Sequence, residues 1–248
     1  MKNRETSPGA FGFLAGAYFF LAALLLVACT CGRGPLPPAL YSVFDERWAA
    51  VELRVRCVAG ATFALVGDDG SPQVTREGED FEMPRGSGVL ISSTQLLTAE
   101  HVADLSSIPP FLSACALYAY LPSGRRYQLT QEYGSKVYDV ARLRASVGIF
   151  YEFERAPIVA DAPDPGEDIC LAPAYPMRLR RCGEVQYNNG KPPGDVVHAA
   201  ITEPGNSGGA AYNRAGNLVG IVTHLWKCSS TGQICGGRVQ SIHPEFFR

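Results

Sequence analysis

Short runs of alternating apolar and polar residues, separated by turn-forming residues, make up most of the chain after residue 50. The run Val51–Val58 alternates with a period of two, which is the pattern of a strand with one buried face. A second short run, 61–66, follows Gly60, and the polar stretch 67–84 predicts a loop. Further runs of this kind predict strands at 88–92, 95–98, 116–121, 127–131, 156–159, 168–172, 183–187, 196–201, 209–212, 218–223 and 238–241.

Turn signals such as Ser123-Gly124 and Asn189-Gly190 separate these strands at close intervals. Many short strands with such turns predict an all-β fold, a barrel or a sandwich. Helix is expected only as single turns, after His101 and at 244–247. The Pro- and Asp-rich segment 162–166 is suited to link two halves, so we divide the folded region into 45–160 and 161–248.

The first 44 residues have a different pattern. Lys2 and Arg4 precede an uncharged run of 18 residues, 11–28, which is close to the roughly 20 residues that span a bilayer. Residues 1–28 are therefore predicted to be a signal peptide or an uncleaved signal anchor. Residues 29–44 include a Gly- and Pro-rich stretch that predicts an extended tether.

The end of the apolar run, Leu26-Val27-Ala28-Cys29, resembles a bacterial lipobox, in which the cysteine is lipidated and becomes the mature N-terminus. This favours Cys29 as a lipidation site over a signal anchor. Both alternatives place the folded region outside the cytoplasm and attached to a membrane in the cell envelope. Thr30 follows the cysteine, and the lack of Asp there favours the periplasmic face of the outer membrane in a Gram-negative cell.

Composition and charge narrow the class of protein. Apolar residues make up 46% of the chain, which is enough for a packed core. The 22 basic and 24 acidic residues give a net charge of −2 without a basic run, so no nucleic-acid partner is expected. The sequence has no CxxC pair and no histidine cluster, so no metal site is expected either.

Eight cysteines indicate an oxidising compartment. With Cys29 set aside, seven remain, and the sequence alone leaves their connectivity open. Cys170 and Cys182, and likewise Cys228 and Cys235, are close enough in sequence to close small loops, which would leave Cys57 and Cys115 as the remaining pair and Cys31 unpaired.

The stretch Pro204–Gly209 places three glycines around Ser207. Glycine permits backbone conformations that a Cβ forbids and lets another molecule approach the main chain. A serine on such a turn can present its hydroxyl group to a substrate while nearby N–H groups point to the same place. These are the requirements of an acyl-transfer nucleophile and its oxyanion hole.

Two further segments supply the partners that such a serine needs. His101 ends the segment Thr98-Ala-Glu-His101 after an apolar strand, and Asp139 begins Asp139-Val-Ala. A neutral imidazole can remove the proton of a serine near pH 7, and a carboxylate fixes the tautomer of the imidazole and stabilises its charged form. The competing aspartates Asp161, Asp164 and Asp168 lie in a Pro-rich stretch and are expected to be solvated.

These three motifs, in the order His, Asp, Ser, resemble the trypsin/chymotrypsin superfamily of serine proteases, and in particular its bacterial secreted and HtrA-like members. The resemblance covers roughly residues 45–248. It implies two antiparallel six-stranded Greek-key β-barrels with the active site in the cleft between them. His101 and Asp139 would lie on the first barrel and Ser207 on the second, with an oxyanion hole formed by the N–H groups of Gly205 and Ser207.

Three departures from the family pattern are informative. Val102 stands where animal enzymes have a disulfide cysteine, so that bridge is absent. Asn206 stands where those enzymes have an aspartate that pairs with the N-terminus freed by zymogen cleavage, so we expect activity without cleavage inside the fold. Only 248 − 207 = 41 residues follow Ser207, fewer than the roughly 80–100 of the PDZ domain that HtrA proteins usually carry. No PDZ domain is expected.

By the same resemblance, the substrate-binding residues include Ile201, Thr223, His224 and Leu225. Ala200 and Ile201 favour an apolar specificity pocket without an acid at its base, and hence no preference for Lys or Arg. His224 and Arg238 offer the alternative of attracting an acidic residue. Ser87, Ser92, His198 and His243 are expected to be structural.

The sequence therefore predicts a membrane-tethered serine endopeptidase that cleaves a protein or peptide substrate through an acyl-enzyme and needs no cofactor. The alternative is a binding module that keeps the fold and cleaves nothing. The substrate, the oligomeric state and the physiological role are left open.

Overall fold

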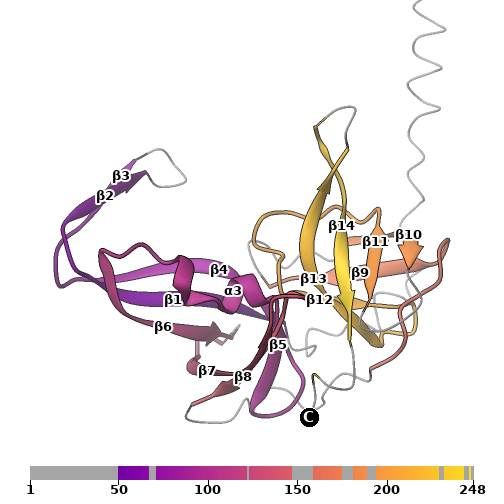
Figure 1. The fold of residues 1–248 in the computed structure, drawn as a ribbon, viewed down its shortest axis with the longest axis horizontal. Coiled ribbons are helices and arrows are strands. Elements are labelled where there is room, and N and C mark those ends of the chain that lie inside the picture. Colours follow the sequence, from indigo (N-terminus) through magenta and orange to yellow (C-terminus); the bar gives the residue numbers. More distant parts are fainter. Residues whose placement is uncertain are drawn as a thin grey trace, which may run out of the picture. The chain divides into compact units, whose positions relative to one another are not determined.

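The computed structural model describes residues 50–66, 71–121, 123–146, 159–174, 181–188, 194–228, 232–242 and 246, which all lie in one compact unit, Ser42–Arg248. This unit is built almost entirely from antiparallel strands (Figure 1). No helix in the described ranges is long and apolar enough to cross a membrane. The predicted signal segment 1–28, the tether 29–44 with Cys29 and Cys31, and His243 lie outside the described residues.

Six strands close the first barrel in the order β1-β4-β5-β8-β7-β6. In β1 the alternation of the sequence appears directly as burial, because Val51, Leu53 and Val55 face the core and the residues between them are partly exposed. The strands of this barrel are β1 (Ala50–Ala59), β4 (Asp80–Leu90), β5 (Gln95–Thr98), β6 (Leu112–Tyr120), β7 (Arg126–Ser135) and β8 (Val140–Ala145).

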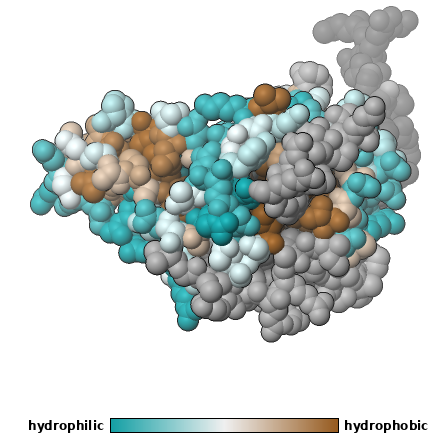
Figure 2. Space-filling model, turned by 60° about the horizontal axis from the view of Figure 1, so that its bottom comes forward, coloured by the Kyte–Doolittle hydropathy of each residue, from teal (hydrophilic) through white to brown (hydrophobic). Residues whose placement is uncertain are grey.

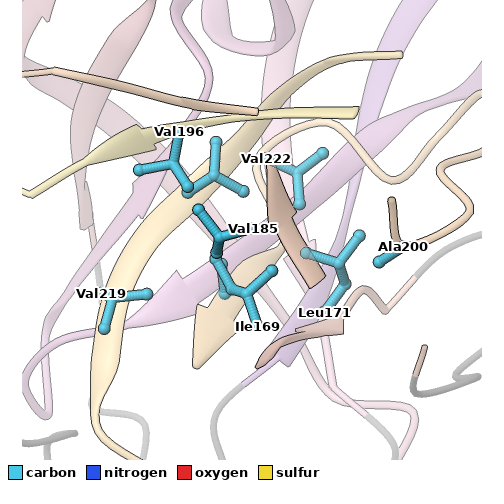
Figure 3. Packing of buried hydrophobic residues seen from close by; sticks show 9 residues of the cluster. Ile169, Leu171, Val185, Val196, Ala200, Val219 and Val222 are labelled. Atoms are coloured by element: carbon cyan, nitrogen blue, oxygen red, sulfur yellow. The ribbon is translucent and has the colours of Figure 1, made fainter. Parts of the chain in front are cut away.

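Six more strands close the second barrel, in the order β10-β11-β14-β13-β12-β9. Its core is a cluster of aliphatic side chains from facing strands, including Ile169, Leu171, Val196, Val219 and Val222 (Figure 3). The strands are β9 (Asp168–Ala172), β10 (Arg181–Asn188), β11 (Asp195–His198), β12 (Ala210–Tyr212), β13 (Leu218–Lys227) and β14 (Ile234–Ser241).

Both barrels have the same topology. Counted along the chain within each barrel, the neighbours run first, second, third, sixth, fifth, fourth, which is a Greek-key arrangement. The all-β fold of two six-stranded antiparallel barrels, expected from the resemblance, is confirmed.

Two segments differ from the sequence prediction. The stretch 67–84, expected to be a loop, contains β3 (Pro72–Thr75), which pairs with β2 (Phe63–Val66) as a hairpin, and the first residues of β4. Most of β3 is exposed, so its sequence carries no apolar periodicity that could reveal it. The strand β8 was not expected either. Of the strand expected at 156–159, only Val159 is described, and it forms an isolated bridge with Leu218.

The hairpin β2–β3 lies at the end of the first barrel away from the second, and Figure 2 shows apolar residues gathered at that end of one face. Its base is anchored by Phe63, whose ring centroid lies 5.2 Å from that of Phe81 and 5.0 Å from that of Phe111. Leu65 and Val74 of the hairpin are exposed.

Three disulfides join Cys57 to Cys115, Cys170 to Cys182 and Cys228 to Cys235. The two short-range pairs and the remaining pair expected from the sequence are therefore confirmed. The first bridge lies within the first barrel and the other two within the second.

Candidate active site

His101 is held on a single helical turn directly after β5. This turn, α3 (Glu100–Ala103), begins two residues before the predicted start at Val102. Val102 and Ala103 are buried and fix the turn against the first barrel, whereas the His101 side chain is 49% exposed. The turn that carries the imidazole is thus anchored in the barrel, whereas the ring itself is open to the solvent.

Asp139 holds both the ring and the backbone of His101. Nδ1 of His101 lies 2.8 Å from Oδ2 and 3.0 Å from Oδ1 of Asp139, and the backbone N–H of His101 donates to Oδ1 at 3.0 Å. The two residues meet because β5 and β8 are neighbours, with Thr98 paired to Ala141. Asp139 has φ +52°, a conformation that is uncommon outside glycine and often found at functional sites.

Burial alone would raise the pKa of the Asp139 carboxyl group. The hydrogen bonds from the ring and the backbone of His101 outweigh burial and hold this pKa below its ordinary value. Asp139 is therefore ionised at neutral pH, and it accepts the Nδ1–H of His101. This leaves Nε2 of the neutral imidazole as the unprotonated nitrogen.

Ser207 lies on the glycine turn that precedes β12. Gly205 (φ +93°) and Gly208 (φ +81°) both have left-handed conformations that favour glycine. The Ser207 hydroxyl group donates to the carbonyl of Thr223 at 3.3 Å, rather than to His101. Within the described part of the chain, the backbone N–H groups of Gly205 and Ser207 donate no hydrogen bond, so both can bind a ligand oxygen.

A cleft of about 510 Å³ joins these groups. Its lining comes from both barrels: Glu100, His101, Asp104, Lys136, Asp139, Ser207, Thr223, His224 and Leu225. The structure therefore brings the three predicted catalytic residues together with three of the four predicted substrate-binding residues. The fourth, Ile201, is 51% exposed and does not line this cleft.

The family comparison covers most of the residues that line this cleft, all except Thr223, His224 and Leu225. A sequence profile of the trypsin-like peptidase domain matches residues 86–221, which include His101, Asp139 and Ser207. The chain belongs to this family.

Solved structures of an HtrA-type protease, AlgW, resemble this trypsin-like peptidase chain. The structure of AlgW with a decapeptide has a TM-score of 0.57 and 22% identity, and the match covers 82% of this chain and 63% of that one. The structure with a tripeptide has a TM-score of 0.53 and 20% identity, covering 84% and 60%. At this identity the likeness concerns the fold, and this chain spans less than two thirds of their length. No curated protein matches significantly.

His224, predicted to bind substrate, also lies close to His101 and Asp139. Its Nδ1 is 4.0 Å from Oδ2 of Asp139, and its ring centroid is 5.9 Å from that of His101. The Asp139 carboxylate thus lies near two imidazoles, of which only His101 is within hydrogen-bonding distance. Arg238, the other residue considered for attracting an acidic substrate, lies 3.4 Å from Asp195.

Arg85 contacts the site although no sequence motif marked it. One Nη2 atom donates to the carbonyls of His101 at 3.0 Å and Asp104 at 2.9 Å, and to Oγ of Ser107 at 3.2 Å. Nε donates to the carbonyl of Val102 at 3.4 Å. This guanidinium group therefore binds the end of the turn that carries His101. The signal in the sequence is a lone basic residue directly before Gly86-Ser-Gly, which is too common to be recognised.

Glu100 is a second group that the sequence did not single out. Its side chain is buried next to His101 and accepts a hydrogen bond from Gln131 at 3.1 Å. Burial raises the pKa of Glu100, and the hydrogen bond from Gln131 partly opposes this. A carboxyl group with a raised pKa thus lies beside the imidazole.

Proposed function

We propose that this trypsin-like peptidase is a serine endopeptidase in which Ser207, His101 and Asp139 form a catalytic triad. The observation that carries the proposal is the 2.8 Å contact between Nδ1 of His101 and Oδ2 of Asp139, in a cleft that Ser207 also lines. The N–H groups of Gly205 and Ser207, which donate no hydrogen bond to any described residue, also support it.

In acylation, Nε2 of His101 removes the proton of the Ser207 hydroxyl group as Oγ attacks the peptide carbonyl carbon. The hydroxyl group must first rotate away from the Thr223 carbonyl, to which it donates in the absence of substrate. The carbonyl π bond breaks, and its electron pair moves to the oxygen, which binds the N–H groups of Gly205 and Ser207. Asp139 stabilises the imidazolium that forms.

Collapse of this intermediate breaks the C–N bond, and His101 gives its proton to the departing amine. A water molecule then attacks the carbonyl carbon of the acyl-enzyme, and His101 takes its proton. Collapse of this second intermediate breaks the C–O bond to Ser207, His101 returns the proton to Oγ, and the second product leaves as a carboxylic acid. Each step uses only groups of this chain, the substrate and water.

We also propose that the fold is active without internal cleavage. Asn206 is buried, and its Oδ1 accepts a hydrogen bond from the backbone N–H of Glu203 at 2.9 Å. The side chain at this position is thus used within the turn itself, which supports a nucleophile turn that needs no ion pair with a new N-terminus. Full-length protein that reacts only after proteolysis near residue 45 would contradict this.

Export and attachment to a membrane through Cys29 complete the proposal, supported by the lipobox-like sequence. Cells that express the chain and are fed labelled palmitate should incorporate the label, and the Cys29→Ser variant should not. Label that persists in Cys29→Ser, or none in the wild type, would reject lipidation at this residue.

The catalytic proposal is tested with a fluorophosphonate probe and a peptide library, using folded and oxidised protein. We expect probe labelling and peptide cleavage by the wild type and neither by Ser207→Ala. A wild-type protein that is folded but neither labels nor cleaves would support the binding module instead. The same library tests the apolar specificity pocket, which predominant cleavage after Lys or Arg would contradict.

A further inference from the structure

Ser87 of β4 connects the first barrel to the turn 204–209 that carries Ser207, here called the nucleophile turn. It does so through both its backbone and its side chain. Its backbone N–H donates to the carbonyl of Ser207 at 2.8 Å. Its hydroxyl group donates to the carbonyl of Gly205 at 3.1 Å and accepts the backbone N–H of Ala174 at 3.0 Å. The side chain is fully buried. A single residue of the first barrel thus binds two carbonyls of a turn that belongs to the second.

These two carbonyls belong to the two residues whose N–H groups would form the oxyanion hole. A peptide unit is rigid, so the orientation of each N–H depends on the φ and ψ angles at its own residue and at its neighbours. Gly205 has φ +93° and no side chain, and nothing intrinsic restricts it to one orientation. The bond from Ser87 Oγ to the Gly205 carbonyl supplies that restriction from outside the turn.

The surroundings of Ser87 hold it in place. The carbonyl of Ser87 accepts a hydrogen bond from Oγ1 of Thr98 at 2.7 Å, and Thr98 lies three residues before His101. Gly208 packs so closely against Ser87 and Thr98 that a Cβ at this position would overlap both the Ser87 carbonyl and Oγ1 of Thr98. The segments that carry the base and the nucleophile therefore share one set of contacts, with Ser87 at its centre.

We propose that Ser87 is a positioning residue that fixes the oxyanion-binding N–H groups of Gly205 and Ser207. The inference rests on the proposed function, because it assigns Ser87 a part in the same reaction. The side chain acts through the turn and does not touch the substrate. Its loss should weaken binding of the transition state more than binding of the peptide in its ground state.

The test compares Ser87→Ala with Ser92→Ala. Ser92 lies in the β4–β5 turn of the same barrel, and its Oγ also accepts backbone hydrogen bonds, from Thr94 at 3.2 Å and Gln95 at 3.0 Å. Removal of one direct oxyanion donor costs roughly 10²–10³-fold in kcat. Ser87→Ala removes a hydrogen bond that holds the turn and leaves both donor N–H groups in the chain. We therefore expect kcat of Ser87→Ala to fall by about 10–100-fold, with KM changed less than about 3-fold. Ser92→Ala should show no such decrease.

A peptidyl trifluoromethyl ketone, which forms a hemiketal with an anionic oxygen, separates positioning from general loosening of the fold. Its Ki should rise in Ser87→Ala by about the factor by which kcat/KM falls, measured well below the melting temperature. Equal kcat and Ki in wild type and Ser87→Ala would overturn the inference, and so would an equal loss in Ser92→Ala. If the wild type itself does not cleave, the proposed function fails and the inference fails with it. An active wild type with an unaffected Ser87→Ala rejects the inference alone.

Discussion

At the scale of single residues, the site depends on how Asp139 is bound. Its two carboxylate oxygens accept hydrogen bonds from the ring and the backbone of His101, and its own backbone has a positive φ. The geometry therefore specifies which nitrogen of the imidazole carries the proton, as well as where the ring lies. An uncharged group of the same shape can hold the ring in the same place, but it does not keep the proton on Nδ1.

This distinction predicts the effect of Asp139→Asn. The amide can donate a hydrogen bond to Nδ1, which stabilises the wrong tautomer and leaves Nε2 protonated. We expect kcat to fall by about 10³–10⁴-fold with the fold intact. Peptide hydrolysis and circular dichroism would measure this, with the exposed Asp161→Asn as control. Activity within about 3-fold of wild type in Asp139→Asn would exclude Asp139 from the triad.

Two glycines with the same backbone conformation differ in how much room there is for a side chain. Gly208 and Gly78 have nearly the same φ, +81° and +82°, but a Cβ would collide with Ser87 and Thr98 at Gly208 and would meet nothing within 4 Å at Gly78. Both Ala variants should lose roughly 1–2 kcal/mol of stability, because a residue with a Cβ is strained in the left-handed conformation. Only Gly208→Ala should also displace the nucleophile turn.

We therefore expect Gly78→Ala to lower the melting temperature slightly and keep its activity, and Gly208→Ala to lose more than about 100-fold in kcat/KM. Thermal unfolding and peptide hydrolysis of both variants are the measurements. Similar activity in the two variants would mean that the close packing at Gly208 does not matter for the site.

At the scale of elements, the site is assembled from strand ends and one short helical turn. A turn of four residues has little stability of its own, so its position depends on contacts from outside. No disulfide holds α3, because Val102 follows His101, and the guanidinium group of Arg85 on β4 binds three of the backbone carbonyls at this turn instead. The strand β4 therefore supports both halves of the site, through Arg85 and through Ser87.

Arg85→Lys tests this support. One ammonium group cannot reach the carbonyls of His101, Val102 and Asp104 together, so carbonyls now bound by Arg85 lose their partner. We expect a loss of about 1–3 kcal/mol in stability and a decrease of roughly 5–20-fold in kcat. Chemical denaturation and peptide hydrolysis would show both. Arg76→Lys, on an exposed turn, serves as the control, and an equal effect in the two variants would contradict a role of Arg85 in holding His101.

The elements also show what the sequence could and could not predict. His101, Asp139 and Ser207 lie in short motifs whose residues are neighbours in the chain, so the sequence alone was enough to predict these three residues, which line one cleft in the structure. Strands with one buried face, such as β1, have a visible period, whereas exposed β3 has none. Ser87 and Arg85 act through contacts with segments 16 to 118 residues away, and only the closed barrels bring these partners together.

At the scale of the whole molecule, three covalent bridges of different span stabilise the two barrels. Cys57 and Cys115 are 58 residues apart, and Cys228 and Cys235 only 7. In the chain-entropy account, a bridge stabilises by restricting the unfolded chain, and the effect grows with the loop that it closes.

We expect Cys57→Ala/Cys115→Ala to lose about 4 kcal/mol and Cys228→Ala/Cys235→Ala about 2 kcal/mol. Urea denaturation of both double variants in oxidising buffer is the measurement. Reduction of all three disulfides in the wild type should cost more stability than either double variant loses. A larger loss for the short bridge would show that the entropy of the unfolded chain is not the dominant effect.

Stability should also depend on pH through His198, which is buried inside the second barrel. Neither ring nitrogen has a hydrogen-bond partner among the described residues. Burial lowers the pKa of His198 from 6.5 to about 4, although the nearby backbone of Ala200 offsets part of this effect. Between these two values the unfolded chain binds more protons than the folded one, so the free energy of unfolding falls as the pH falls.

The loss from this residue should amount to about 3 kcal/mol between pH 7 and pH 4, since each unit of pKa corresponds to about 1.4 kcal/mol. His198→Leu removes the titrating group and keeps an apolar side chain of similar size in the barrel. Urea denaturation from pH 7 to pH 4 should therefore give a flatter profile for the variant than for the wild type. Carboxylates such as Asp139, whose pKa is also lowered by folding, act in both proteins and cancel in the difference. Parallel profiles would mean that His198 binds a proton in the folded barrel as readily as in the unfolded chain, and would contradict a lowered pKa for this residue.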